Sequence, residues 1–180
     1  MDFRKILSRF SACFNRDRQE TGRAAVPEAG EVSQDESDYS QLLPLDAEAL
    51  AEQGIKEAYD ELVPRLRALG IEPEPIEEVV DNDEPSYLVK HRGAVYPVYK
   101  ASAGEDEGHS WGRATYALFH IVNLQLEKSD RQFYAFYGGN DLGGMLMTKE
   151  EFQAARGEII RQKDWPYLPT LEDEWFGQPH

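Results

Sequence analysis

Residues 110–147 constrain the fold of this chain more than any other segment, because they hold its most apolar predicted helix and its most aromatic predicted strand. Apolar side chains occupy nearly every position from Ala114 to Leu126, and we expect Ser110 to cap the helix that contains them. A helix that is apolar on all sides must be covered by its neighbours. Because this helix is too short to cross a bilayer, the pattern predicts the central helix of a globular core.

A hairpin is predicted directly after this helix. Residues 132–137 include four aromatic side chains, and the loop GGNDLGG at 138–144 leads into a second strand at 145–147. Glycines around Asn and Asp permit the left-handed backbone that tight hairpins need. A glycine-rich loop can also cradle phosphate, but such a loop is followed by a helix and usually carries a cation, and this one has neither. Hairpin geometry is therefore the preferred interpretation.

The remaining segments predict an α+β fold. Periodicity indicates a helix over about residues 47–69, weakened in its first part by Gly54 and kinked or split near Pro64. It also indicates an antiparallel three-strand meander within residues 76–99. Thr148 and Glu151 have the spacing of a capping box at the start of a last helix. Together these elements predict an antiparallel sheet of about five strands packed on a buried central helix, with flanking N- and C-terminal helices.

Three regions are predicted along the chain. Residues 1–14 form an amphipathic basic arm, for which a membrane surface, a partner's groove and its own domain are all open as docking sites. Residues 15–42 are polar, so we expect a disordered linker. Residues 43–180 form a single acidic α+β domain that ends in an extended, aromatic C-terminal tail. The start of the chain lacks the continuous apolar run of a secretory signal, and we expect a cytoplasmic location.

The net charge of −15 limits the classes of partner. Residues 42–180 carry 13 cations and 26 anions, a net −13, so the acidity belongs to the predicted domain. Nucleic acids and anionic membranes require clustered cations, and we expect the domain to bind neither. A basic protein partner is expected instead, because opposite charges accelerate encounter. Ordinary solubility is the alternative explanation for the charge.

Two acidic groups and two aromatic residues are the candidate partner-binding residues. One acidic group lies on the solvent face of the predicted first helix, and the second lies in a predicted exposed loop at 101–109. The aromatic residues lie near the C-terminus. Plain solvation of the charges, and packing of the aromatic rings on their own domain, are the alternatives. The candidates are Glu57, Asp60, Glu61, Glu105, Asp106, Glu107, Trp175 and Phe176.

The sequence assigns no catalytic, cofactor-binding or metal-binding residue, and no cofactor is expected. It holds no nucleophile elbow, zinc-protease motif, phosphate loop or dinucleotide fingerprint. The single cysteine, Cys13, lies in the predicted arm, and the four histidines lack ligand spacing. The rival to a binding protein is a small enzyme that uses a carboxylate and His120 in a pocket lined by Trp111 and Tyr134. A buried neutral histidine is the other interpretation of His120.

The order of the predicted elements resembles that of bacterial immunity proteins, which neutralise polymorphic and type VI secretion toxins. The similar features are a helix, strands, a buried helix, the hairpin GGNDLGGMLM at 138–147 and a helix capped by T-x-x-E. The resemblance covers roughly residues 43–170 and carries over no site residue. It implies a non-enzymatic cytoplasmic antitoxin whose acidic surface occludes a basic toxin domain. A third hypothesis is a membrane-peripheral adaptor held by residues 1–14.

Overall fold

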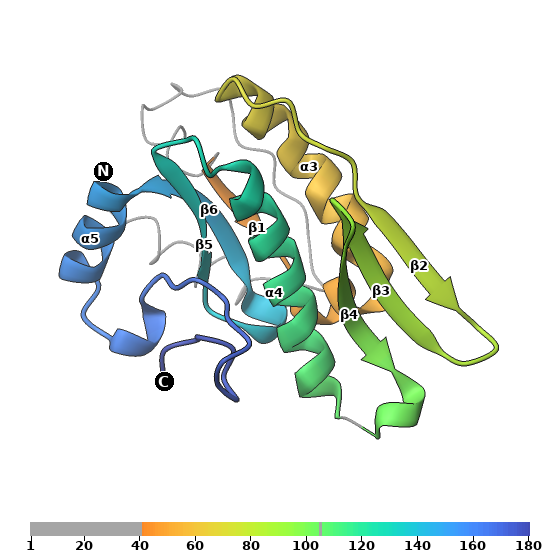
Figure 1. Cartoon of the computed structure of the whole chain (residues 1–180). Coiled ribbons are helices and arrows are strands. Elements are labelled where there is room, and N and C mark those ends of the chain that lie inside the picture. Colours follow the sequence, from red (N-terminus) through yellow and green to blue (C-terminus); the bar gives the residue numbers. More distant parts are fainter. Residues whose placement is uncertain (1–40, 105) are drawn as a thin grey trace, which may run out of the picture.

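Two sheets with a helix between them dominate the computed structural model of the chain (Figure 1). The structure describes residues 41–104 and 106–180, so the predicted arm at 1–14, most of the predicted linker and Glu105 lie outside the described residues. Each sheet has three antiparallel strands. The α+β prediction is confirmed, whereas the strands are divided between two sheets in place of one sheet of about five.

The first sheet, sheet A, has the strand order β1-β6-β5. β5 (Arg131–Phe136) and β6 (Gly143–Thr148) form the predicted hairpin, and the loop between them contains a 3₁₀ turn at Gly139–Asp141. The sequence pattern does not predict β1 (Leu42–Pro44), because a strand of three residues is too short to show a hydrophobic periodicity. Both leucines of β1 are buried, so the folded region begins before the predicted boundary at residue 43.

The second sheet, sheet B, is the predicted meander, with the strand order β2-β3-β4. Its strands are β2 (Glu77–Asp81), β3 (Ser86–His91) and β4 (Ala94–Lys100). Pro97 lies on the edge strand β4, close to a shift in its register against β3. An edge position with irregular pairing tolerates a residue that has no amide donor.

Helix α4 (Glu107–Gln125) explains why the strands form two sheets. It contacts β4 of sheet B and β5 of sheet A, and α3 (Ile55–Ala68) packs against it as well (Figure 1). A helix that is apolar on all sides needs cover on all sides, and a single sheet covers only one. The prediction of a buried central helix is therefore confirmed. Within residues 41–104 and 106–180, no helix has the length and apolar character needed to cross a membrane.

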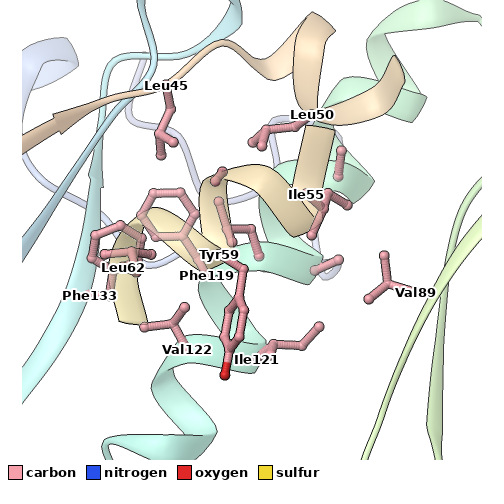
Figure 2. Close-up of a cluster of buried hydrophobic side chains, with 14 of the residues drawn as sticks. Leu45, Leu50, Ile55, Tyr59, Leu62, Val89, Phe119, Ile121, Val122 and Phe133 are labelled. Atoms are coloured by element: carbon pink, nitrogen blue, oxygen red, sulfur yellow. The ribbon is translucent and has the colours of Figure 1, made fainter. Parts of the chain in front are cut away.

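The main core lies where α4 meets its neighbours (Figure 2). Phe119 of α4 stacks on Phe133 of β5 with ring centroids 4.4 Å apart, and Leu62 and Val89 belong to the same cluster. Helix α5 (Lys149–Glu158) packs with a second cluster on the opposite face of sheet A. The predicted capping box at the start of α5 is confirmed, since the side chains and backbone amides of its two residues pair reciprocally.

The predicted first helix is broken at a different place from the one expected. It consists of α2 (Ala47–Ala49), the π-helical segment η2 (Leu50–Gly54) and α3 (Ile55–Ala68). The break lies at Gln53, whose φ of 75° is left-handed, whereas α3 continues through the exposed Pro64. Gly54 supports the break, because a Cβ there would lie 2.6 Å from the Ala49 carbonyl oxygen.

Part of the C-terminal segment packs on its own domain, as expected. Tyr167 is buried and pairs with Ala135 of β5 through two backbone hydrogen bonds of 2.8 and 2.9 Å. The Trp165 indole donates to the Ile159 carbonyl at 3.0 Å. The segment therefore continues the outer edge of sheet A instead of extending into solvent.

Candidate functional site

The described acidic candidates fall into two separate groups. Glu57, Asp60 and Glu61 lie on α3 around a shallow depression, which Glu78 of β2 also lines. Lys56 lies within this depression, forms an ion pair with Asp60, and donates its backbone N–H to Glu78 Oε1 at 2.9 Å. A cation of the chain itself therefore offsets part of the negative charge of this α3 group.

The second group surrounds the N-terminus of α4. Glu48 and Glu52 meet Asp106 and Glu107 around a depression of about 280 Å³. Tyr99 and Trp111 line it together with Ala51 and Ser110. None of these described lining residues is Lys or Arg. We refer to Glu48, Glu52, Tyr99, Asp106, Glu107 and Trp111 as the α4 acidic surface.

Asp106 holds this surface in place because it caps α4. Its side chain accepts hydrogen bonds from the backbone N–H of His109 at 3.0 Å and from the His109 ring at 2.9 Å. The side-chain hydrogen bond from His109 is the main cause that lowers the pKa of Asp106. The prediction of Ser110 as the N-cap was wrong, since α4 starts at Glu107 and Ser110 is buried. Asp106 and Glu107 consequently belong to a helix end and not to a loop.

The break in the first helix separates the two acidic groups. Glu52 lines the depression next to α4, whereas the adjacent Gln53 lines the depression on α3. Because the backbone turns at Gln53, carboxylates before and after it lie on different surfaces.

The two aromatic candidates lie beside the α4 acidic surface. Trp175 is 51% exposed, and Phe176 lies against Gly112 on α4. Both line a pocket of about 440 Å³ that shares Asp106 and Trp111 with the acidic surface. The fold thus gathers Asp106, Glu107, Trp175 and Phe176, and it leaves the α3 group elsewhere.

The residues proposed for the rival enzyme lie in different parts of the described structure. Trp111 lines the pockets beside the N-terminus of α4, whereas His120 lies further along the helix and stacks on Tyr116 with ring centroids 5.0 Å apart. Burial lowers the pKa of His120. Tyr134 belongs to the second core cluster and stacks on Phe152 at 4.5 Å. Within the described residues, no group of three or more His, Cys, Asp or Glu side chains is arranged to hold a metal ion.

Sequence inspection missed His91, the most buried histidine of the described chain. It is 2% exposed in sheet B, and neither ring nitrogen forms a hydrogen bond of normal geometry with the described residues. Burial is the main cause that lowers the pKa of His91, and the nearby Pro75 carbonyl opposes this effect. Its alternation in the strand 87–91 indicated burial, but no sequence signal indicated that its nitrogens would lack partners.

We predict that His91 makes stability depend on pH below neutrality. The pKa of His91 is lower in the folded state than its ordinary value of 6.5, so the unfolded state binds more protons between these two values. Stability is therefore complete above about pH 6.5 and decreases as the pH falls toward the folded-state pKa. Between pH 7.5 and 5.5 we expect the wild type to lose more unfolding free energy than H91L, which lacks the titrating ring.

Urea unfolding at several pH values measures this difference. H180L, altered at the exposed C-terminal residue, serves as the control and should follow the wild type. Equal pH dependence of the wild type and H91L would contradict the assignment.

Comparisons with protein-family models, curated proteins and solved structures find no match to this chain. The functional interpretation therefore rests on its own geometry and charge.

Proposed function

We propose that this chain is a non-enzymatic protein-binding domain that receives a basic partner on the α4 acidic surface. The observation that carries this proposal is the grouping of four carboxylates with Tyr99 and Trp111, without Lys or Arg among the described lining residues. Carboxylates that have no lysine or arginine among the described residues around them favour a ligand of opposite charge, and aromatic rings are effective anchors at protein interfaces. The α3 group supports the proposal less well, because Lys56 already pairs with Asp60 there.

Preorganisation also supports binding at this surface. Asp46 caps α2 by accepting from the N–H groups of Glu48 and Ala49, and Asp106 caps α4. Carboxylates on or beside capped helix ends need less ordering when a partner arrives, so less binding free energy is lost. Opposite charge would also accelerate association and make it sensitive to salt.

We further propose that the partner is a bacterial toxin domain and that the protein acts in the cytoplasm as its immunity protein. This part rests on the resemblance in element order and on the acidity of the domain. Occlusion of a basic active site requires an exposed negative surface, and the α4 acidic surface provides one.

Affinity capture with the full chain tests the proposal. We expect one stoichiometric basic partner, identified by mass spectrometry from the native host, to bind at 50 mM salt and to be weakened at 500 mM salt. A partner with a toxin-like domain would support the immunity role. The absence of a specific partner at both salt concentrations would contradict it.

Two double variants with the same change of charge locate the interface. E52Q/E107Q removes two exposed carboxylates of the α4 acidic surface, and E57Q/E61Q removes two exposed carboxylates from α3. We expect E52Q/E107Q to raise the dissociation constant about tenfold and E57Q/E61Q to change it less than about twofold. Surface plasmon resonance at constant salt measures both, and the reverse order would move the interface to α3.

A further inference from the structure

A pocket enclosed by the C-terminal segment has the composition of a site for an organic cation. It has a volume of about 440 Å³ and lies between the first turns of α4, the hairpin loop at 138–139 and residues 174–178. This volume is within the range of small-molecule sites. Four aromatic side chains line it, from Trp111, Tyr167, Trp175 and Phe176.

The C-terminal wall of this pocket packs closely against two glycines, so this wall is part of the fold. A Cβ at Gly112 would overlap the ring of Phe176, and a Cβ at Gly138 would overlap the side chain of Gln178. The backbone of this wall is also held, because the N–H of Thr170 donates to the Phe176 carbonyl at 3.0 Å. Phe176 and Gln178 consequently have defined positions before any ligand binds, and Trp175 stacks on His180 with ring centroids 5.1 Å apart.

The charges around the pocket select the sign of a ligand. Asp106, Glu174 and His109 line it, the His109 ring is hydrogen-bonded to Asp106 at 2.9 Å, and none of the described lining residues is Lys or Arg. The hydrogen bond from His109 helps to keep Asp106 ionised, since it lowers the pKa of this carboxyl. The positive end of the α4 helix dipole also lies nearby, but acidic side chains at that helix end offset it. An anion in the pocket would therefore meet the negative charge of two carboxylates.

We infer that this pocket binds an organic cation that carries an alkylated ammonium group. Faces of aromatic rings attract such cations through their quadrupole, and quaternary ammonium groups are bound by aromatic cages. The carboxylates of Asp106 and Glu174 supply the opposite charge. This inference does not depend on a protein partner, since the cation can come from a free quaternary ammonium compound. A lysine side chain of a partner on the adjacent α4 acidic surface is the other source.

An NMR titration of the full chain with choline tests the inference. We expect saturable shifts of amides from residues 106–112 and 174–178, with a dissociation constant on the order of 1 mM. The neutral carbon isostere 3,3-dimethylbutan-1-ol has the same shape without the charge, and it should bind at least about tenfold more weakly. N-acetyl-lysine methylamide is titrated in parallel. Tighter binding of choline indicates a free quaternary ammonium ligand, and tighter binding of the lysine compound indicates a partner side chain.

Variants on the two walls give an independent test. E174Q and W175L alter exposed residues, and each should weaken choline binding about fivefold or more. E172Q removes the same charge from the same segment outside the pocket lining and should bind as the wild type does. G112A should also weaken binding, because the new methyl group displaces Phe176. Loss of helical stability would not explain that result, since alanine favours a helix over glycine.

Equal binding of choline and its neutral isostere would overturn the inference, because the pocket would then select shape without charge. The absence of saturable shifts with both choline and N-acetyl-lysine methylamide, each up to 50 mM at constant ionic strength, would overturn it as well. Neither result would contradict the proposed protein partner. The E52Q/E107Q double variant tests the contact with that partner, and both of its altered residues lie outside this pocket.

Discussion

Replacement of Phe119 by alanine is expected to lower the free energy of unfolding by about 3–5 kcal/mol. Phe119 is fully buried in α4 and stacks on Phe133 of β5, so it joins the central helix to sheet A. Its removal loses the transfer free energy of the ring and leaves a cavity that the surrounding core fills only in part. The decrease is a large fraction of the stability of an ordinary domain, which is roughly 5–15 kcal/mol.

Urea unfolding of the full chain, followed by intrinsic fluorescence and far-ultraviolet circular dichroism, measures this effect. I160A is the matched control, because Ile160 is a large apolar residue that is 86% exposed. We expect I160A to change the unfolding free energy by less than about 0.5 kcal/mol. A loss of less than about 1 kcal/mol in F119A would mean that Phe119 does not occupy the core described above.

Replacement of Asn123 by alanine is expected to lower the free energy of unfolding by about 2–4 kcal/mol. The Asn123 side chain donates to the Phe133 carbonyl at 3.0 Å and accepts from the Phe133 N–H at 2.7 Å. One side chain on α4 thus occupies the hydrogen-bonding edge of β5, in the way a further strand would. Its removal leaves a buried backbone donor and acceptor without their partner, and each lost pairing costs roughly 1–3 kcal/mol.

Asn140 provides the matched control for this substitution. Its exposed amide makes a single 3.2 Å hydrogen bond to Glu48, and N140A should change the unfolding free energy by less than about 0.5 kcal/mol. Hydrogen exchange gives a second measurement. The Phe133 amide should exchange faster in N123A than in the wild type, and unchanged exchange would contradict the structural role of Asn123.

Several local features were predictable because they depend on neighbours along the chain. Most residues from Ala114 to Leu126 are buried, as the apolar character of this segment predicts, and the capping box follows from Thr148 and Glu151. The break of the first helix was assigned to Pro64, yet an exposed proline on α3 was tolerated. The break occurs at Gln53 instead, next to a glycine that packs closely on the Ala49 carbonyl.

The candidate site was only partly predictable for a related reason. Charge patterns identified Asp106 and Glu107 as candidates, and aromatic side chains near the C-terminus identified Trp175 and Phe176, but nothing in these patterns placed the tail beside the N-terminus of α4. Glu48 and Glu52 were not named as site residues, because no local pattern brings the start of the first helix to the N-terminus of α4. Gly112 is an inconspicuous helix residue in the sequence, and its role is evident only from the ring of Phe176 that covers it.

Local patterns predicted the α+β class, the central helix, the meander, the hairpin and the acidity of the domain, because periodicity, turn residues and charge act over a few neighbouring positions. Three features could be seen only in the folded chain: the division of the strands between two sheets, the grouping of the carboxylates, and the pocket that the C-terminal segment lines. These features depend on contacts between residues distant in the sequence. Such contacts form where α4 requires cover on every side, and no local pattern specifies which distant segment will provide it.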